Sequence, residues 1–128
     1  MNFSLTNTTR ARLPNISWQA LTRRALASSY VLSVVICADA LSRTLNNKYR
    51  AKNKPANVLS FPLSKTSGEI FLNIKQASRE ARLYERTQSK HLEALFIHGL
   101  AHLRGLSHGK KMEVFEARLL SSRPRIEN

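Results

Sequence analysis

One segment of the chain, HGLAHLRGLSH (residues 98–108), carries three of its four histidines. His98 and His102 are four residues apart, so on a helix their imidazoles lie one turn apart on the same face. Gly105 follows where that helix should end, because glycine adopts at little cost the positive φ that helix C-termini often need. A turn at Gly105 reverses the chain, so the segment predicts that His108 approaches His98 and His102 from another direction.

Three imidazoles that meet at one point are typical of a metal site. Catalytic zinc sites take three protein ligands and keep a fourth position open, whereas structural sites use four ligands, usually with cysteine. No cysteine lies near this segment, so we predict that His98, His102 and His108 hold about one zinc ion per chain. Imidazole also binds copper, nickel and iron, which leaves the identity of the metal open. The alternative is three separate histidines in local hydrogen bonds, which the spacing and the glycine turn disfavour.

The residue after the first histidine argues against a zinc peptidase. Zinc peptidases carry the motif H-E-x-x-H, in which the glutamate is the general base. Gly99 stands at that position here, so proteolysis is disfavoured. Glycine inside a helix also costs about 1 kcal/mol relative to alanine, which suggests that another element packs closely against Gly99. The fourth histidine, His91, lies seven residues before His98, about 10 Å along a helix axis, so we expect it to serve packing or a supporting contact and not to bind the metal.

The composition describes a small, strongly basic globular protein. The 128 residues suffice for one domain (1–128), and 42% of them are hydrophobic, so the chain should fold around its own core. The 21 Lys and Arg against 8 Asp and Glu give a net charge of +13. This excess favours a polyanionic partner, nucleic acid first and an anionic membrane surface second. The alternative is that the charge only confers solubility.

Cysteine usage and hydropathy predict a cytoplasmic protein. Cys37 is the single cysteine, which excludes an intramolecular disulfide and fits a reducing compartment, and its apolar neighbours predict burial. The first ten residues lack the apolar core of a signal peptide. The longest apolar run, residues 30–38, is too short to cross a bilayer, so no membrane span is expected.

The hydrophobic periodicity predicts an α+β domain, with a small mixed β-sheet packed against helices. Strands are expected at residues 2–6, 31–37, 58–61 and 69–72. The strand at 31–37 should be central and buried, because it is a nearly continuous β-branched run. Pro62 should end the third strand, and a turn over residues 64–68 should return the fourth strand antiparallel to it.

Helices are expected between and after these strands. One should begin near Pro14 with Trp18 as a core anchor, and a second over residues 38–49 shows helical spacing through Leu41 and Leu45. A third is expected over 74–86, the histidine helix should begin near Ser89, and a last short one should cover residues 112–119. Residues 121–128 are expected to form a frayed basic tail.

Basic residues gather in two places that we predict to contact nucleic acid. Residues 43–54 contain basic but no acidic side chains, and basic residues on the helix expected over 74–86 recur every three or four residues as one stripe. The predicted contact residues are Lys52, Lys54, Lys75, Arg79, Arg82 and Arg86. The alternative is that the stripe is an ordinary solvated helix face.

Two stretches of the chain match known motifs in order and spacing. The segment LNNKYRAKNKPANVLSFP (residues 45–62) is similar to L-N-x-x-Y-R-x-K-D-K-P-T-D/N-V-L-S-F-P, and the histidine segment is similar to H-G-x-L-H-L-x-G-Y-D-H. Gly68-Glu69-Ile70 and Met112-x-x-x-Glu116 are also similar to a G-D-I and an M-x-x-x-E. In these residues the chain resembles the YbeY family of bacterial rRNA maturation factors, which are metal-dependent endoribonucleases.

The resemblance implies a zincin-related, metal-dependent hydrolase fold, with zinc on His98, His102 and His108. It implies that Arg50 faces the metal cleft as a catalytic residue and contacts the substrate phosphate. It further implies single-strand-specific RNA cleavage, maturation of the 3′ end of small-subunit rRNA and a role in ribosome quality control. The implied partners are rRNA, the small ribosomal subunit and an Era-type GTPase.

Several positions depart from the family pattern. The family's Tyr and Asp before the third histidine are replaced by Leu106 and Ser107, and other replacements are Asn53, Ala56 and Glu69. Loss of a carboxylate that orients an imidazole would weaken metal affinity. A second hypothesis therefore stays open, a non-catalytic rRNA-binding assembly factor with a structural or vestigial metal site. If the chain is catalytic, no general base is evident, and the nucleophile is a metal hydroxide or the 2′-OH of the RNA.

Overall fold

A four-stranded mixed sheet forms the centre of the fold. The computed structural model describes residues 2–121. The strands are β1 (Asn2–Asn7), β2 (Val31–Cys37), β3 (Val58–Ser64) and β4 (Ser67–Asn73). They lie in the order β1-β2-β4-β3, with β2 parallel to both of its neighbours and β3 antiparallel to β4. The central position of β2 and the antiparallel β3–β4 pair confirm the predictions from the sequence.

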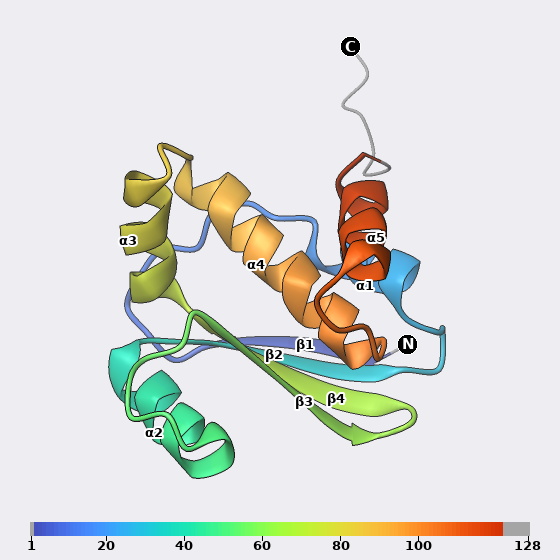
Figure 1. Ribbon diagram of the computed structural model, residues 1–128, viewed down its shortest axis with the longest axis horizontal. Coiled ribbons are helices and arrows are strands. Elements are labelled where there is room, and N and C mark those ends of the chain that lie inside the picture. The colour runs from blue at the N-terminus through green and yellow to red at the C-terminus, as the bar shows by residue number, and fades with distance from the viewer. Residues whose placement is uncertain (1, 122–128) are drawn as a thin grey trace.

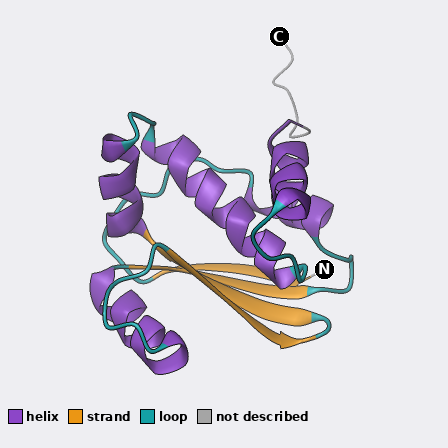
Figure 2. Ribbon diagram, viewed as in Figure 1, coloured by secondary structure: helices purple, strands orange, loops and turns teal. Residues whose placement is uncertain are grey.

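Five helices pack around this sheet within the described residues (Figures 1 and 2). They are α1 (Trp18–Ala25), α2 (Asp39–Arg50), α3 (Ile74–Leu83), α4 (Gln88–Leu103) and α5 (Lys110–Ser121). The long helix α4 crosses one face of the sheet, with α1, α3 and α5 on the same side, whereas α2 lies on the other side at one end. The predicted α+β fold class is confirmed.

The hydrophobic core lies between the sheet and α4. Leu32, Val34 and Ile36 alternate along β2 with more exposed residues and are buried beneath the helices. Phe96 of α4 is fully buried, and the Trp18 ring meets it edge-on, with 4.9 Å between the ring centroids. Such edge-to-face pairs stabilise a core beyond the apolar area that they bury. Trp18 is therefore a core anchor, as predicted.

The single cysteine is buried, and none of the described helices resembles a membrane span. Cys37 is fully buried at the end of β2, as expected from its apolar neighbours. Burial, together with the nearby Asp39 carboxylate, raises the pKa of the Cys37 thiol to about 11, so this cysteine stays protonated and unreactive at neutral pH. Among residues 2–121, no helix combines the length and the apolar character that crossing a membrane requires.

The structure corrects several predicted boundaries. α1 begins at Trp18 and not near Pro14. β3 does not end at Pro62 but continues to Ser64, because β3 is an edge strand that tolerates a missing N–H, and its register with β4 shifts there. The turn after β3 is consequently shorter than predicted and covers residues 65–66. α3 ends at Leu83, three residues early, since the chain turns away at Glu85, whose φ is +55°.

The buried face of α2 is polar, contrary to the apolar spacing predicted for this helix. Leu41 is exposed, whereas Ser42 and Asn46 are almost fully buried. The Asn46 side-chain amide donates to the carbonyl oxygen of Lys54 (2.9 Å), and the Ser42 hydroxyl oxygen accepts from the backbone N–H of Ala56 (3.1 Å). These hydrogen bonds anchor the basic loop of residues 51–57 to α2, at the edge of the sheet formed by β3.

The last helix, α5, packs back against the core. Met112 and Leu119 are buried, and Phe115 packs beside them, which confirms the predicted helix and extends it at both ends. Of the basic tail predicted for residues 121–128, only Ser121 falls within the described residues, where it is the last residue of α5.

Candidate metal centre

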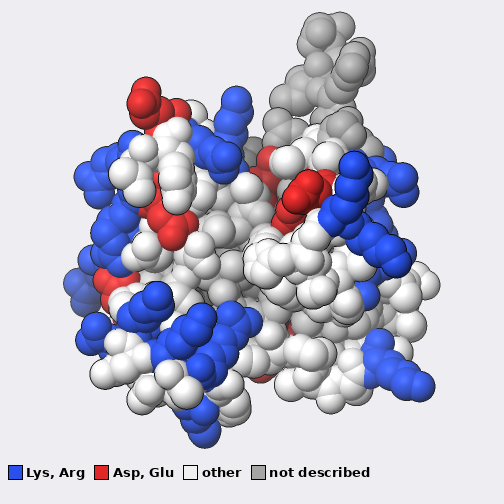
Figure 3. Space-filling model, viewed as in Figure 1, with Lys and Arg blue, Asp and Glu red and all other residues white. Residues whose placement is uncertain are grey.

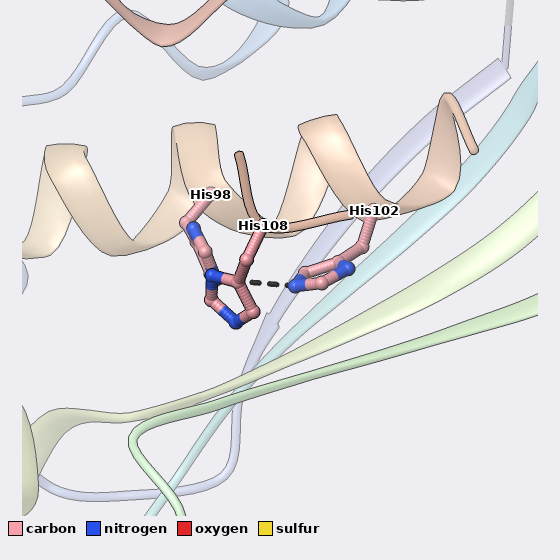
Figure 4. A group of neighbouring side chains, drawn as sticks. All are labelled: His98, His102 and His108. Atoms are coloured by element: carbon pink, nitrogen blue, oxygen red, sulfur yellow. Dashed lines mark hydrogen bonds between the residues drawn. The ribbon is translucent and has the colours of Figure 1, made fainter. Parts of the chain in front are cut away.

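The turn after α4 brings three histidines together. Gly105, with a φ of +89°, donates its N–H to the carbonyl oxygen of His102 (2.9 Å) just beyond the helix end at Leu103. The positive φ and this hydrogen bond confirm the predicted glycine turn. Figure 4 shows the result: His98 and His102 project from one face of α4, and His108 reaches the same point from the loop beyond Gly105.

The three imidazoles have the spacing of metal ligands. The Nε2 atoms of His98 and His102 lie 3.1 Å apart, and one ring nitrogen from each of the three histidines lies within 4.8 Å of the others. Two nitrogens that bind one zinc at about 2.0–2.1 Å in a tetrahedral site lie roughly 3.3 Å apart, so the closest pair fits directly. His98 and His102 are half-buried, whereas His108 is exposed, so the point of convergence is open to solvent. The donor set fits a tetrahedral metal with one accessible position.

A carboxylate from α5 orients the first histidine. Nδ1–H of His98 donates to Oε2 of Glu116 at 2.8 Å, which leaves the lone pair of Nε2 directed towards the other two histidines. A hydrogen bond of this kind fixes the tautomer of a metal ligand and raises its basicity. The loss of the family's aspartate at Ser107 therefore does not leave the centre without a carboxylate. Glu116 was absent from the predicted site residues, although its place in the M-x-x-x-E motif was a usable signal.

We expect Glu116→Ala to lower zinc affinity by about 10- to 100-fold, because the His98 ring loses its orienting partner. The measurement is a competition titration against a chelator of known affinity, with circular dichroism to verify the fold. Glu113→Ala is the matched control, since Glu113 is an exposed acidic residue on the same helix. If Glu116→Ala, Glu113→Ala and wild type bind zinc with equal affinity, Glu116 does not support metal binding by His98.

The surroundings of His102 keep its imidazole neutral. Burial is the largest cause that lowers the pKa of His102, and the neighbouring His98, His108 and Arg50 lower it further, against an opposing effect of Glu116. A lowered pKa keeps the ring in its metal-binding form to a lower pH than a free histidine. Arg50 is the exposed last residue of α2, and its positive charge contributes to the lowered pKa of His102.

The backbone of α4 lies unusually close to the sheet at Gly99. The Ser60 hydroxyl of β3 donates to the carbonyl oxygen of Gly99 at 3.0 Å. A Cβ atom on Gly99 would lie 3.1 Å from Oγ of Ser60 and 3.2 Å from the Ile70 side chain, which is tighter than ordinary packing. This confirms the close approach predicted at Gly99. Ser60, which sequence reasoning did not select, holds the histidine helix at a fixed height over the sheet.

The fourth histidine belongs to a separate buried network. Nε2 of His91 lies 2.8 Å from Oε1 of Glu80, and both carboxylate oxygens of Glu80 lie 3.2 Å from the amide nitrogen of Asn57. Burial alone would raise the pKa of Glu80, but hydrogen bonds from His91, Gln76 and Asn57 outweigh it and lower that pKa. His91 thus packs α4 against α3 and the loop before β3, in agreement with the supporting role predicted for it.

The predicted basic stripe is divided in the structure. Lys52 and Lys54 are exposed in the loop after α2, and Lys75, Arg79 and Arg82 are exposed on α3. Arg86 lies beyond the end of α3, with Nη1 at 3.4 Å from Nδ1 of His91, so its expected place on the stripe is wrong. The Arg79 guanidinium contacts both carboxylate oxygens of Asp39, one of them at 2.6 Å. Figure 3 shows Lys and Arg gathered over α2 and α3.

An α+β domain with three convergent histidines on a helix and the following turn has the features of zincin-like metal-dependent hydrolases. A sequence profile described as "Endoribonuclease YbeY" matches residues 3–122, so the chain belongs to the YbeY family. Three relatives, each named "Endoribonuclease YbeY", come from Anaplasma phagocytophilum, Gluconobacter oxydans and Aquifex aeolicus. They are 40%, 39% and 37% identical to this chain over 77%, 70% and 73% of its length. The matches span 70%, 58% and 67% of those relatives.

A solved structure supports the fold independently. The solution structure of a protein from Thermotoga maritima superposes with a TM-score of 0.65, covering 93% of this chain and 87% of that protein, at 20% sequence identity. At this identity the likeness concerns the fold alone. The resemblance inferred from the two motifs is thus confirmed at the level of the family, whose name describes enzymes that cleave RNA internally.

Proposed function

We propose that this chain is a single-strand-specific, metal-dependent endoribonuclease with about one zinc ion bound by His98, His102 and His108. The observation that carries this proposal is the convergence of three imidazole nitrogens within 4.8 Å of one another at a solvent-accessible point, in a member of an endoribonuclease family. Residues 1–128 form a single catalytic domain in this proposal. Its place of action is the cytoplasm.

The chemistry divides between the metal and the residues around it. His98, His102 and His108 would hold a zinc ion, which would supply Lewis-acid chemistry by lowering the pKa of a water towards ~7 and polarising a phosphoryl oxygen. His98, fixed by Glu116, and His102, kept neutral by burial, present their lone pairs for ligation. Arg50 donates two N–H groups to the scissile phosphate and stabilises the charge that develops on it. Gly99 leaves no carboxylate at the position of the peptidase general base, which directs the centre away from peptide hydrolysis.

The cellular role follows the family resemblance. We propose that the substrate is the 3′ end of small-subunit rRNA and that the protein also acts in ribosome quality control, with the small ribosomal subunit and an Era-type GTPase as partners. The net charge of +13 supports an RNA partner, because Lys and Arg that neutralise phosphates release counterions on binding.

The proposal is tested by incubating purified protein with a single-stranded RNA that carries the small-subunit rRNA 3′ end, and with the same RNA annealed to a complement. We expect internal cleavage of the single strand, little cleavage of the duplex and loss of cleavage in a chelator. Binding to both RNAs without any cleavage by metal-containing protein would favour the alternative, an rRNA-binding assembly factor with a structural or vestigial metal site.

The contribution of the basic helix α3 is measured by the salt dependence of RNA binding. RNA affinity falls as salt concentration rises, and the slope of log affinity against log salt reports the number of phosphates that the protein neutralises. We expect the double change Arg79→Glu and Arg82→Glu to reduce the magnitude of this slope by about one for each phosphate that α3 no longer neutralises. The matched control reverses Arg23 and Arg24, which are exposed at the end of α1 and give the same change in net charge. Equal slopes for the two double variants would make α3 an ordinary solvated face.

A further inference from the structure

One face of the sheet carries an exposed row of aromatic rings. Within residues 2–121, α1, α3, α4 and α5 lie on one side of the sheet, and on the other side only α2 lies against one end (Figure 1). The aromatic row, which we define as Tyr49, Phe61 and Phe71, runs from the end of α2 over β3 to β4 on this open side. The ring centroids of Tyr49 and Phe61 are 5.2 Å apart, and those of Phe61 and Phe71 are 5.8 Å apart.

The row is accessible, and apolar residues extend it. Tyr49 is 58% exposed and Phe61 and Phe71 are partly exposed, so their rings are not closed off by a helix. In the sheet Phe71 pairs with Val35, and Val31, on the same side of β2, is 46% exposed. Such a surface costs free energy in water unless something covers it, and large exposed apolar patches commonly mark binding sites.

Basic side chains border the aromatic row at Tyr49. Nζ of Lys48 lies 5.2 Å from the centroid of the Tyr49 ring. The next residue in the chain is the exposed Arg50, and Lys52 is exposed in the following loop. The row also lies close to the histidine helix, because Ser60, which precedes Phe61 in β3, donates its hydroxyl to the carbonyl oxygen of Gly99, next to His98 (3.0 Å). One acidic residue, Glu69, pairs with Phe61 in the sheet and lies on the same side. The charge beside Tyr49 is thus positive, which suits a polyanion with flat, stackable groups.

We propose that the aromatic row is a stacking platform for unpaired bases of single-stranded RNA, and that it leads the strand past the edge strand β3 to the metal centre. This inference rests on the proposed function for its ligand. Bases stack on aromatic rings whatever their sequence, while adjacent Lys and Arg bind the backbone phosphates. The adjacency of Tyr49 and Arg50 couples the two steps: one holds a base while the other faces the scissile phosphate.

Tyr84 provides a matched control for Tyr49. Both tyrosines are 58% exposed, and each has a basic side chain over its ring, Lys48 for Tyr49 and Arg86 for Tyr84 at 6.0 Å. Tyr84 lies at the end of α3 and outside the aromatic row. A general effect of removing a surface tyrosine would appear equally in both variants, whereas base stacking on the row would appear only at Tyr49.

The test measures the affinity of a short single-stranded RNA for wild type, Tyr49→Leu, Tyr49→Phe and Tyr84→Leu, in a chelator so that the RNA stays intact. We expect Tyr49→Leu to bind at least about fivefold more weakly, because leucine keeps the apolar contact but cannot stack, and the other two variants to bind as wild type. A second set of RNAs, each with one abasic residue at a different position, is then bound to wild type and to Tyr49→Leu, which gives a double-mutant cycle between protein and RNA. The abasic position that weakens binding to wild type should have no further effect on Tyr49→Leu.

Three results would contradict the proposal that the aromatic row stacks RNA bases. The first is an RNA affinity of Tyr49→Leu equal to that of wild type, and the second is an equal loss of RNA affinity in Tyr49→Leu and Tyr84→Leu. The third is a change in oligomeric state of Tyr49→Leu with RNA affinity intact, which would make the row a contact between protein chains. Failure of the proposed function gives a different signature: wild type would not cleave RNA with metal present, while the coupling between Tyr49 and the abasic position would remain.

Discussion

Replacement of His98, His102 or His108 by alanine should each abolish tight metal retention. Each change leaves two imidazoles around a site that takes three protein ligands, and the remaining nitrogens cannot complete a tetrahedral site without extra water. Purified wild type should hold about one divalent ion per chain by elemental analysis, and each variant close to none after dialysis. Cleavage of single-stranded RNA should fall with the metal content, because both depend on the same ion.

The control for this experiment is the fourth histidine. His91→Gln changes a histidine on the same helix that contacts Glu80 and lies outside the cluster of three, so metal content should stay at the wild-type level. Circular dichroism establishes that each variant is folded. Full metal occupancy in all three alanine variants would refute the assignment of the ligands.

Arg50→Ala should cut RNA at a small fraction of the wild-type rate while binding metal and RNA nearly normally. In the proposed mechanism the Arg50 guanidinium contacts the scissile phosphate most strongly when charge builds in the transition state, so we expect its loss to affect the rate more than the affinity. Losing one such donor typically costs on the order of 10²–10³ in rate. Overall affinity should change little, because one phosphate contact shifts the salt slope by only about 1. Arg50→Lys should recover part of the rate, since a point charge cannot form the bidentate contact.

Single-turnover cleavage and equilibrium binding, measured side by side, separate these effects. Arg43→Ala is a suitable control, because Arg43 is an exposed arginine on the same helix, seven residues before Arg50. A wild-type rate for Arg50→Ala would reduce Arg50 to one surface charge among many. An equal loss of RNA affinity and of rate would show that Arg50 contributes to binding and not to the transition state.

Local pattern was sufficient to predict the parts of the fold that depend on neighbouring residues. The spacing of His98 and His102 and the glycine at position 105 specify a helix and its ending, and both occur as predicted. The β-branched run of β2 specified a buried central strand. Gly99 signalled a close contact, because glycine in a helix requires a reason outside the helix.

Contacts between elements could not be predicted in the same way. The bond between Glu116 and His98 depends on how α5 docks against α4, which no periodicity in either helix specifies. Hydrophobic spacing predicted the wrong buried face for α2. Ser42 and Asn46 are buried on that helix because they hold a loop by hydrogen bonds, and not because they fill the apolar core. Arg86 does not lie on the predicted stripe, because α3 ends at Leu83 and the chain turns before it reaches Arg86.

The most direct test of the three-histidine centre is a zinc titration of metal-free protein, with the rate of single-stranded RNA cleavage measured after each addition. A catalytic centre on His98, His102 and His108 predicts no cleavage without metal and a rate that rises with added zinc until it levels off at about one equivalent per chain. Cleavage at full rate by the metal-free protein, or zinc-saturated protein that binds RNA without cutting it, would contradict that assignment.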